Sequence, residues 1–349
     1  MVKKVAVFFL MVFVICIGIT AFAEEKSPRI VSERPITQIS FSSWIQETFR
    51  VSPDNRRVAY VIKVGNKQCV VVDGKEEKQY DGIGANTLIF SPDSKRVAYG
   101  ARLGNNWFVV VDRKEEKQYD DIGQSGPLFS SDSKRVAYGA RLGNNWFVVV
   151  DRKEKKQYDD IAKGTPLFSP DSKQVAYGAR EGVTWFVVVD EKEEKQYDDI
   201  GQGSPLFSPD SKRVAYTAQV DNKWFVVVDE KEEKQYDGIG VPIFSPDSKR
   251  VAYGARVGNN WFVVVDRKEE KQYDGIGQGS PLFSPDSKRV AYGARVGNKW
   301  CVVVDRKEEK HYDGIVTKRE GSIIFDSAES LHYLALIGKD IYLVEERIK

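Results

Sequence analysis

Histidine and cysteine are scarce in this chain, and this limits the chemistry that it can carry out. The two histidines are His311 and His332, and neither has a second histidine or a cysteine at metal-ligand spacing in the sequence. Because a zinc site needs three or four such ligands, we interpret both as surface residues and expect no metal ion. The G-x-S-x-G, H-E-x-x-H and phosphate-binding glycine motifs are absent from the sequence. We therefore expect neither catalysis nor a cofactor.

Aspartate recurs at a fixed place, in a Ser-Pro-Asp-Ser segment or a close variant of it. A ring of carboxylates suggests calcium, but Ca²⁺ takes six or more oxygen ligands and each segment offers a single acid. Asp and Ser side chains also bond back to the backbone of tight turns, so we assign these acids to turns. The residues are Asp93, Asp132, Asp171, Asp210, Asp247 and Asp286.

Arginine and glutamine form two further recurring sets and are the best binding candidates. The guanidinium group binds carboxylates through paired hydrogen bonds, so such an array would hold an acidic peptide, a glycan or a protein loop. The alternative is that each arginine pairs with an acid of a neighbouring repeat and that the nearby tryptophans are core residues. The candidates are Arg102, Arg141, Arg180, Arg256 and Arg295, with Gln124, Gln202 and Gln278.

These sets recur because the chain itself is repetitive. The segment beginning at Phe90 returns with few changes at Phe129, Phe168, Phe207, Phe244 and Phe283, and in a divergent form at Phe49. A fixed period of about 39 residues indicates a repeat architecture.

Each repeat contains four short strand patterns and no helical period. In one copy, Val97–Ala101 and Trp107–Val111 are rich in β-branched and aromatic residues and are bounded by turn residues. These two segments predict strands b and c of the repeat. A short segment around Phe90 predicts strand a, and the polar Lys117–Ile122 predicts an outer strand d. Four antiparallel strands per unit predict an all-β fold, the β-propeller.

The motif FSPDSKRVAY followed by WFVVVD resembles the WD40-like repeat of TolB-type β-propellers. This chain departs from that pattern at Ser94 and its counterparts, where glycine is usual, and at Ser131, where proline is usual. The resemblance covers most of residues 49–345. It implies the propeller fold and a periplasmic role in docking envelope proteins.

The number of blades follows from the copies and from the C-terminal segment. Ser322–Glu345 predicts three strands in register with the repeat, so a fourth is missing. We expect Ile36–Phe41 or its neighbours to supply it, because closed propellers commonly complete the last blade with a strand from the other terminus. This gives eight blades, and seven blades with a terminal extension is the alternative. In either ring, the b–c turns and d–a connections share one face, which would carry the arginines and glutamines.

The N-terminus predicts export. Residues 1–23 combine Lys3 and Lys4 with an apolar run and a small-x-small cleavage site, as in a secretory signal peptide. The expected organisation is therefore a signal peptide at 1–23, an N-terminal segment at 24–48 and the propeller at 49–349. Removing the signal leaves equal numbers of basic and acidic side chains, which does not favour nucleic acid as a partner. Cys69 and Cys301 replace a strand-c phenylalanine and are expected to be buried.

We expect an exported, monomeric and non-enzymatic propeller in the periplasm or outside the cell, with no membrane span after signal cleavage. It would act as a scaffold for an envelope or extracellular protein or peptide, including an acidic one. The alternative is a sugar-binding protein or enzyme at the channel mouth, which would need a local break in the repeat. Such breaks occur at Thr217–Asp221, Gly238–Pro242, Glu181–Thr184 and Lys63–Cys69, and none of them gathers an acid, a base and a nucleophile. A purely structural repeat with no fixed ligand is the third interpretation.

Overall fold

The computed structural model describes residues 32–348, apart from 85, 202, 204, 278, 280 and 317–322. The predicted signal peptide therefore lies outside the described residues, as do Gln202 and Gln278. The chain divides into two units, Met1–Pro35 and Ile36–Lys349, and all the strands lie in the second. Within the described ranges, no helix is long and apolar enough to cross a membrane.

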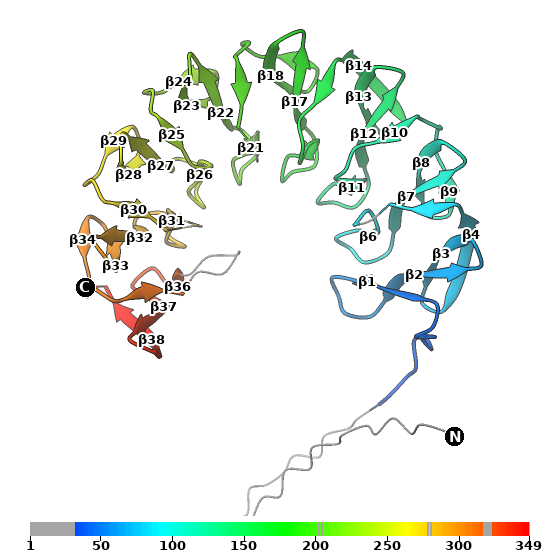
Figure 1. The fold of residues 1–349 in the computed structure, drawn as a ribbon, viewed down its shortest axis with the longest axis horizontal. Coiled ribbons are helices and arrows are strands. Elements are labelled where there is room, and N and C mark those ends of the chain that lie inside the picture. Colours follow the sequence, from blue (N-terminus) through cyan, green and yellow to red (C-terminus); the bar gives the residue numbers. More distant parts are fainter. Residues whose placement is uncertain are drawn as a thin grey trace, which may run out of the picture. The chain divides into compact units, whose positions relative to one another are not determined.

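Eight antiparallel sheets of four or five strands follow one another along the second unit, and consecutive sheets lie side by side (Figure 1). The prediction of an eight-bladed β-propeller is confirmed. Blade 1 consists of β1 (Trp44–Val51), β2 (Val58–Val64), β3 (Lys67–Val72) and β4 (Lys75–Tyr80), and blade 2 consists of β5 (Gly82–Ile83), β6 (Ile89–Phe90), β7 (Val97–Leu103), β8 (Asn106–Val111) and β9 (Lys114–Glu115). Blade 3 consists of β10 (Asp121–Ile122), β11 (Leu128–Phe129), β12 (Val136–Leu142), β13 (Asn145–Val150) and β14 (Lys153–Tyr158), and blade 4 consists of β15 (Asp160–Ile161), β16 (Leu167–Phe168), β17 (Val175–Glu181), β18 (Thr184–Val189) and β19 (Lys192–Glu193).

Blades 5 to 8 continue the same order. Blade 5 consists of β20 (Asp199–Ile200), β21 (Leu206–Phe207), β22 (Val214–Val220), β23 (Lys223–Val228) and β24 (Lys231–Glu232), and blade 6 consists of β25 (Gly238–Ile239), β26 (Ile243–Phe244), β27 (Val251–Val257), β28 (Asn260–Val265) and β29 (Lys268–Glu269). Blade 7 consists of β30 (Gly275–Ile276), β31 (Leu282–Phe283), β32 (Val290–Val296), β33 (Lys299–Val304) and β34 (Lys307–Glu308), and blade 8 consists of β35 (Gly314–Ile315), β36 (Ile323–Ser327), β37 (Ser330–Ile337) and β38 (Asp340–Arg347).

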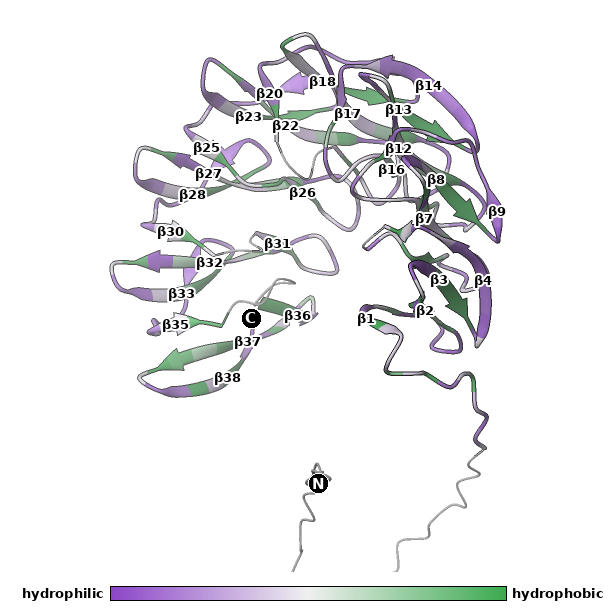
Figure 2. Ribbon diagram, turned by 45° about the vertical axis from the view of Figure 1, so that its right-hand side comes forward, coloured by the Kyte–Doolittle hydropathy of each residue, from purple (hydrophilic) through white to green (hydrophobic). Residues whose placement is uncertain are grey.

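In blades 2 to 7, strand c packs on both sides, because its alternate side chains enter two different cores. In blade 2, Phe108 and Val110 pack with residues of blade 1, whereas Val109 and Val111 pack with residues of blade 3. Strands β8 and β13 are accordingly hydrophobic, and the outer strands β4 and β14 are hydrophilic (Figure 2). The cores therefore lie between blades, as expected for a strand that is apolar on both faces.

Strand a differs from its prediction, because two short strands share its place. In blade 3, both β10 and β11 pair with β12. The expected outer strand Lys117–Ile122 is consequently divided between two blades. Tyr119 bridges Trp107 in blade 2, whereas Asp121 and Ile122 already belong to blade 3. The assignment of all six residues to one outer strand is wrong, because the chain crosses to the next blade at Asp120.

The predicted closing strand is also wrong. Residues 36–40 form no strand, and the Thr37 hydroxyl lies 3.0 Å from that of Tyr60 in blade 1. Trp44–Val51 instead supplies the innermost strand of blade 1, so that blade is complete without residues 36–41. Within the described residues, β38 of blade 8 pairs with β37 and with no N-terminal strand.

Candidate functional site

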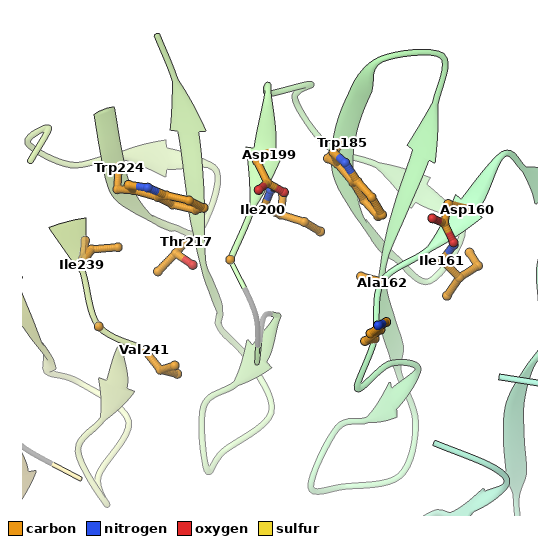
Figure 3. A pocket seen from close by; sticks show the side chains of 13 residues that line it. Asp160, Ile161, Ala162, Trp185, Asp199, Ile200, Thr217, Trp224, Ile239 and Val241 are labelled. Atoms are coloured by element: carbon orange, nitrogen blue, oxygen red, sulfur yellow. The ribbon is translucent and has the colours of Figure 1, made fainter. Parts of the chain in front are cut away.

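A cavity of about 620 Å³ opens between blades 4, 5 and 6 (Figure 3). This volume falls within the range of small-ligand and side-chain pockets. Its walls are mainly apolar, with two carboxylates, one hydroxyl and one ammonium group. The lining residues are Asp160, Ile161, Ala162, Lys163, Trp185, Asp199, Ile200, Gly201, Thr217, Trp224, Ile239, Gly240 and Val241.

Two tryptophans reach this cavity from the start of strand c in blades 4 and 5. The Trp185 backbone N–H donates to the Tyr197 carbonyl and that of Trp224 donates to the Tyr236 carbonyl, both at 2.9 Å. These bonds hold the start of each strand c against the outer strand. Both side chains remain partly exposed, so each offers an aromatic surface on which a ligand can stack.

Breaks in the repeat shape the same cavity. Thr217 of β22 stands where most blades have glycine, for example Gly178 in blade 4. It lies so close to Gly201 that a Cβ at residue 201 would come within 1.9 Å of its Oγ1 atom. Val241 lies in the connection that brings Phe244 only 37 residues after Phe207. Two of the four interruptions noted in the sequence therefore contribute to the wall, and Glu181–Thr184 and Lys63–Cys69 do not line it.

Asp160 and Asp199 add carboxylates to the wall. Their position is aspartate in blades 3, 4 and 5 and glycine in blades 2, 6, 7 and 8, at Gly82, Gly238, Gly275 and Gly314. In blade 4, an Asp160 oxygen lies 3.7 Å from the Arg180 guanidinium. In blade 5, Asp199 pairs in register with Gln219 instead, and no ion pair involves Asp199 in the described part of the chain. The cavity thus combines aromatic surfaces with hydrogen-bond acceptors.

The five predicted arginines do not line this cavity. Four guanidinium groups donate from Nη1 to the carbonyl of the turn that follows, and the fifth donates from Nη2 to a carbonyl at the blade edge. The bonds are Arg102 to Gly104 (2.7 Å), Arg141 to Gly143 (2.8 Å), Arg180 to Gly182 (2.8 Å), Arg256 to Gly258 (2.9 Å) and Arg295 to Asp274 (2.9 Å).

These arginines also contact a tryptophan ring or an aspartate of their own blade. Arg102, Arg141, Arg180 and Arg256 lie over the tryptophan paired with them, at 5.6 to 5.9 Å from the ring centre. Arg141 lies 3.8 Å from Asp121, an acid of its own sheet and not of an adjacent blade. All five remain at least partly exposed. Their role in ligand binding stays a prediction.

Gln124 lines a second cavity of about 150 Å³ together with Trp146 and Asp121. This cavity shares Asp160, Ile161, Ala162 and Lys163 with the larger one. The structure therefore brings Gln124 near the candidate site, on the side of blade 3. Gln202 and Gln278 are among the residues that it does not describe.

Another repeated aspartate has a structural function that the sequence did not indicate. The carboxylate of Asp237 accepts the backbone N–H of Gly258 at 2.7 Å, which fixes the b–c turn of blade 6. This bond and the nearby Lys223 lower the pKa of Asp237 below its ordinary value. Equivalent bonds are made by Asp81, Asp120, Asp159, Asp198, Asp274 and Asp313.

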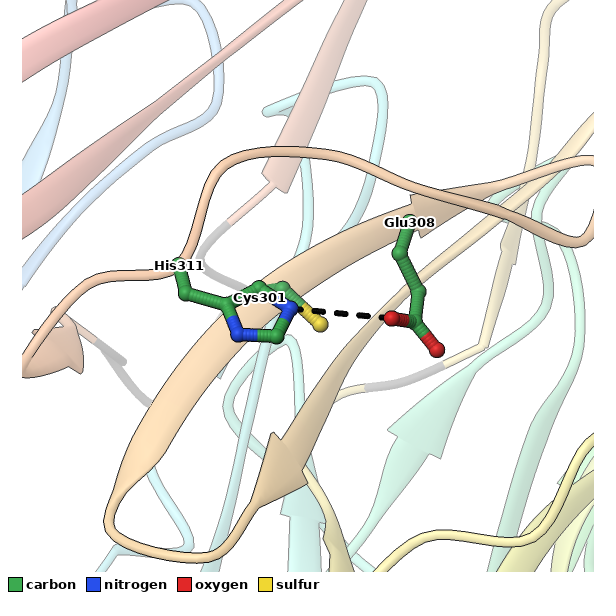
Figure 4. A group of neighbouring side chains, drawn as sticks. All are labelled: Cys301, Glu308 and His311. Carbon is green, nitrogen blue, oxygen red and sulfur yellow. Dashed lines mark ion pairs between the residues drawn. The ribbon is translucent and has the colours of Figure 1, made fainter.

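A second candidate site lies in blade 7. The sequence placed no cysteine at ligand spacing from His311, but the structure brings His311, Glu308 and Cys301 together (Figure 4). One ligand atom from each residue lies within 4.8 Å of the other two. Burial, with Glu308 nearby, raises the pKa of the Cys301 thiol to about 11. His332 instead contacts Asp326 at 2.7 Å.

No protein-family model matches the chain, and no curated protein matches it. Several solved structures resemble it. They include the eukaryotic initiation factor (12% identity, 90% of this chain and 91% of that chain, TM-score 0.48), TolB from Acinetobacter baumannii (16% identity, 72% and 77%, 0.32) and the β-propeller domain of the Trilobed protease from Pyrococcus furiosus, which has an open velcro topology (14% identity, 73% and 92%, 0.34). The β-propeller predicted from the repeat is confirmed by the eight sheets of the chain itself. These likenesses all have TM-scores below 0.5, so they carry no argument about fold or function.

Proposed function

We propose that this chain is an exported β-propeller that binds a partner in the cavity of blades 4 to 6 without catalysing a reaction. The observation that carries this proposal is that the cavity lies where the repeat is interrupted, at Thr217 and Val241. Identical blades present the same surface many times, whereas a site for one ligand is asymmetric. The interruptions supply that asymmetry. Export rests on the signal-like segment at residues 1–23.

The chemistry of the wall indicates the kind of partner. The carboxylates of Asp160 and Asp199 accept hydrogen bonds, and Trp185 and Trp224 offer aromatic surfaces. Lys163 and Arg180 offset part of this negative charge, but Asp199 has no ion pair among the described residues. The wall therefore favours a protein segment that presents lysine, arginine or hydroxyl donors to Asp199 and the tryptophans. A sugar is the second candidate, since its hydroxyl groups and apolar faces suit the same wall.

The proposal is tested by placing a larger side chain at Val241, an exposed valine of the cavity wall. Val241 is 51% exposed, so Val241→Trp adds volume toward the cavity with little effect on the core. Envelope proteins and a glycan panel are presented to the purified chain and to this variant. We expect the parent to retain a partner that Val241→Trp loses.

Val183→Trp is the matched control, because Val183 is also an exposed valine in a connection, at 87%, but does not line the cavity. Both variants must show the parent's thermal unfolding before their binding is compared. Equal retention by the parent and Val241→Trp would contradict the proposed site. A partner lost by both variants would place binding elsewhere on the surface.

A further inference from the structure

Blade 7 departs from the repeat at two positions that face each other. Cys301 replaces the phenylalanine of strand c, and His311 replaces the glutamine of the outer strand. Trp300 bridges Tyr312, so the next cross-strand pair is Cys301 and His311. The corresponding pair in blade 3 is phenylalanine and glutamine, Phe147 and Gln157. Both replacements therefore bring metal-ligating groups into the same place.

Cys69 of blade 1 shows what a cysteine at this position does without a histidine. It is buried like Cys301 and pairs with Gln79. Its thiol donates to the Glu77 carbonyl at 3.1 Å, so it is a satisfied core residue. The Cys301 thiol likewise donates to a carbonyl, that of Ala294 at 3.7 Å, so a core-filling role would explain this residue equally well. That role gives no reason for the histidine opposite.

Glu308 supplies a third ligand atom. One of its oxygens accepts from the Lys271 ammonium at 2.5 Å, as in the equivalent pairs of other blades. The other oxygen lies 3.6 Å from Nε2 of His311. Ligands at typical zinc bond lengths in a tetrahedral site lie about 3.5 Å from one another. The three ligand atoms lie within 4.8 Å of one another, so binding an ion would draw them closer together.

We propose that Cys301, Glu308 and His311 bind one transition-metal ion with the preferences of zinc. Thiolate and imidazole ligands select such an ion over calcium or magnesium, which prefer oxygen alone. Cys301 would hold the ion from the core side, the half-buried Glu308 from beside it and the exposed His311 from the surface. Three protein ligands leave a fourth position for water.

The test is zinc binding by the full chain, reduced and freed of metal beforehand. We expect the parent to bind one equivalent of zinc by calorimetry and to retain it through gel filtration. His311→Gln and Cys301→Phe restore the residues that the other blades carry, so both variants should fold. Each should bind zinc at least about tenfold more weakly, because even the loss of a group that only orients a ligand costs that much.

Cys69→Phe is the matched control, since it makes the same replacement at the equivalent position of blade 1. It should bind zinc like the parent. Cobalt provides a second readout, because a thiolate-to-cobalt absorption band should appear in the parent and in Cys69→Phe but not in Cys301→Phe. The proposal is overturned if the parent binds no zinc, or if His311→Gln and Cys301→Phe bind it as tightly as the parent.

Discussion

A serine with positive φ links each of several blades to the one before it. Ser133, in the a–b turn of blade 3, has a φ of 64°, and its hydroxyl accepts the Asp93 backbone N–H of blade 2 at 2.9 Å. Left-handed backbone costs a non-glycine residue roughly 1–2 kcal/mol. The hydrogen bond offsets part of this cost, which explains serine where related repeats usually have glycine. The other serines are Ser94, Ser172, Ser211, Ser248 and Ser287.

Substitution of Ser172 separates the stabilising hydrogen bond of its hydroxyl from the cost of its positive φ. Ser172→Ala keeps the positive φ and removes the bond to Asp132, so it should lower the free energy of unfolding by about 1–2 kcal/mol. Ser172→Gly removes the same bond but relieves the backbone, so its effect should be smaller. Urea denaturation of the two variants measures the difference. A glycine variant less stable than the alanine variant would refute this account.

The aspartate of each a–b turn has the role expected from the sequence, as Asp93 in blade 2 shows. Asp93 accepts the Ser91 hydroxyl at 2.6 Å and the Lys95 backbone N–H at 3.1 Å. These bonds lower the pKa of Asp93 below its ordinary value, with the Ser91 bond as the largest cause. The bonds lie within one turn, and they confirm the assignment of these acids to turns.

Neighbouring blades pack through pairs of tyrosines, one from an outer strand and one from the next strand b. Tyr119 meets Tyr138 edge to face with ring centres 6.3 Å apart, and it meets Phe147 at 5.4 Å. The Tyr138 hydroxyl donates to Glu116 at 2.8 Å. Burial, followed by the charge of Glu116, raises the pKa of Tyr138 above its ordinary value.

These tyrosines predict unfolding by alkali. The folded state favours their neutral form, so their contribution to stability is complete below the ordinary tyrosine pKa of 10.0 and is lost as pH rises above it. Burial raises the folded pKa of Tyr177 and Tyr197 to about 12. We expect tyrosinate absorbance and loss of the circular-dichroism signal of the sheets to rise together above pH 10. Ionisation of most tyrosines near pH 10 with native sheets would contradict the packing.

Strands b and c were predictable because their side chains carry the pattern. Trp107–Val111 is apolar on both faces since it packs between two blades. The two-residue strands of position a carry no such pattern, and their polar Asp121 resembles the preceding outer strand. Ile36–Phe41 has strand-like alternation but lies near blade 1, whose innermost place Trp44–Val51 already fills. The local sequence pattern cannot decide which of two nearby segments pairs with strand β2 of blade 1.

The candidate sites were predictable in part. The breaks at Thr217 and Gly238–Pro242 were visible in the sequence, and the structure places both in one cavity wall. Asp199 was missed because it was assigned to the outer strand of blade 4. The cluster of Cys301 and His311 was missed because these residues lie ten positions apart in the sequence. The bridge between Trp300 and Tyr312 brings them together.

At the scale of the whole molecule, eight similar blades carry a small number of differences. The blades supply a stable frame through cores that are shared between neighbours. Blades 1 and 8 diverge most from the repeat, and within blades 2 to 7 some differences lie where the cavity and the ligand cluster are found. We infer that the repeated residues maintain the fold and that the exceptions provide the sites.

Backbone hydrogen exchange, measured with and without the captured partner, tests this account most directly. The predicted result is slower exchange at residues 160–163, 199–201 and 239–241, which line the cavity. The equivalent segments of blades 2 and 7, residues 82–84 and 275–277, should exchange at unchanged rates. Protection spread evenly over all blades, or confined to the a–b turns on the other face, would contradict a single site in the cavity of blades 4 to 6.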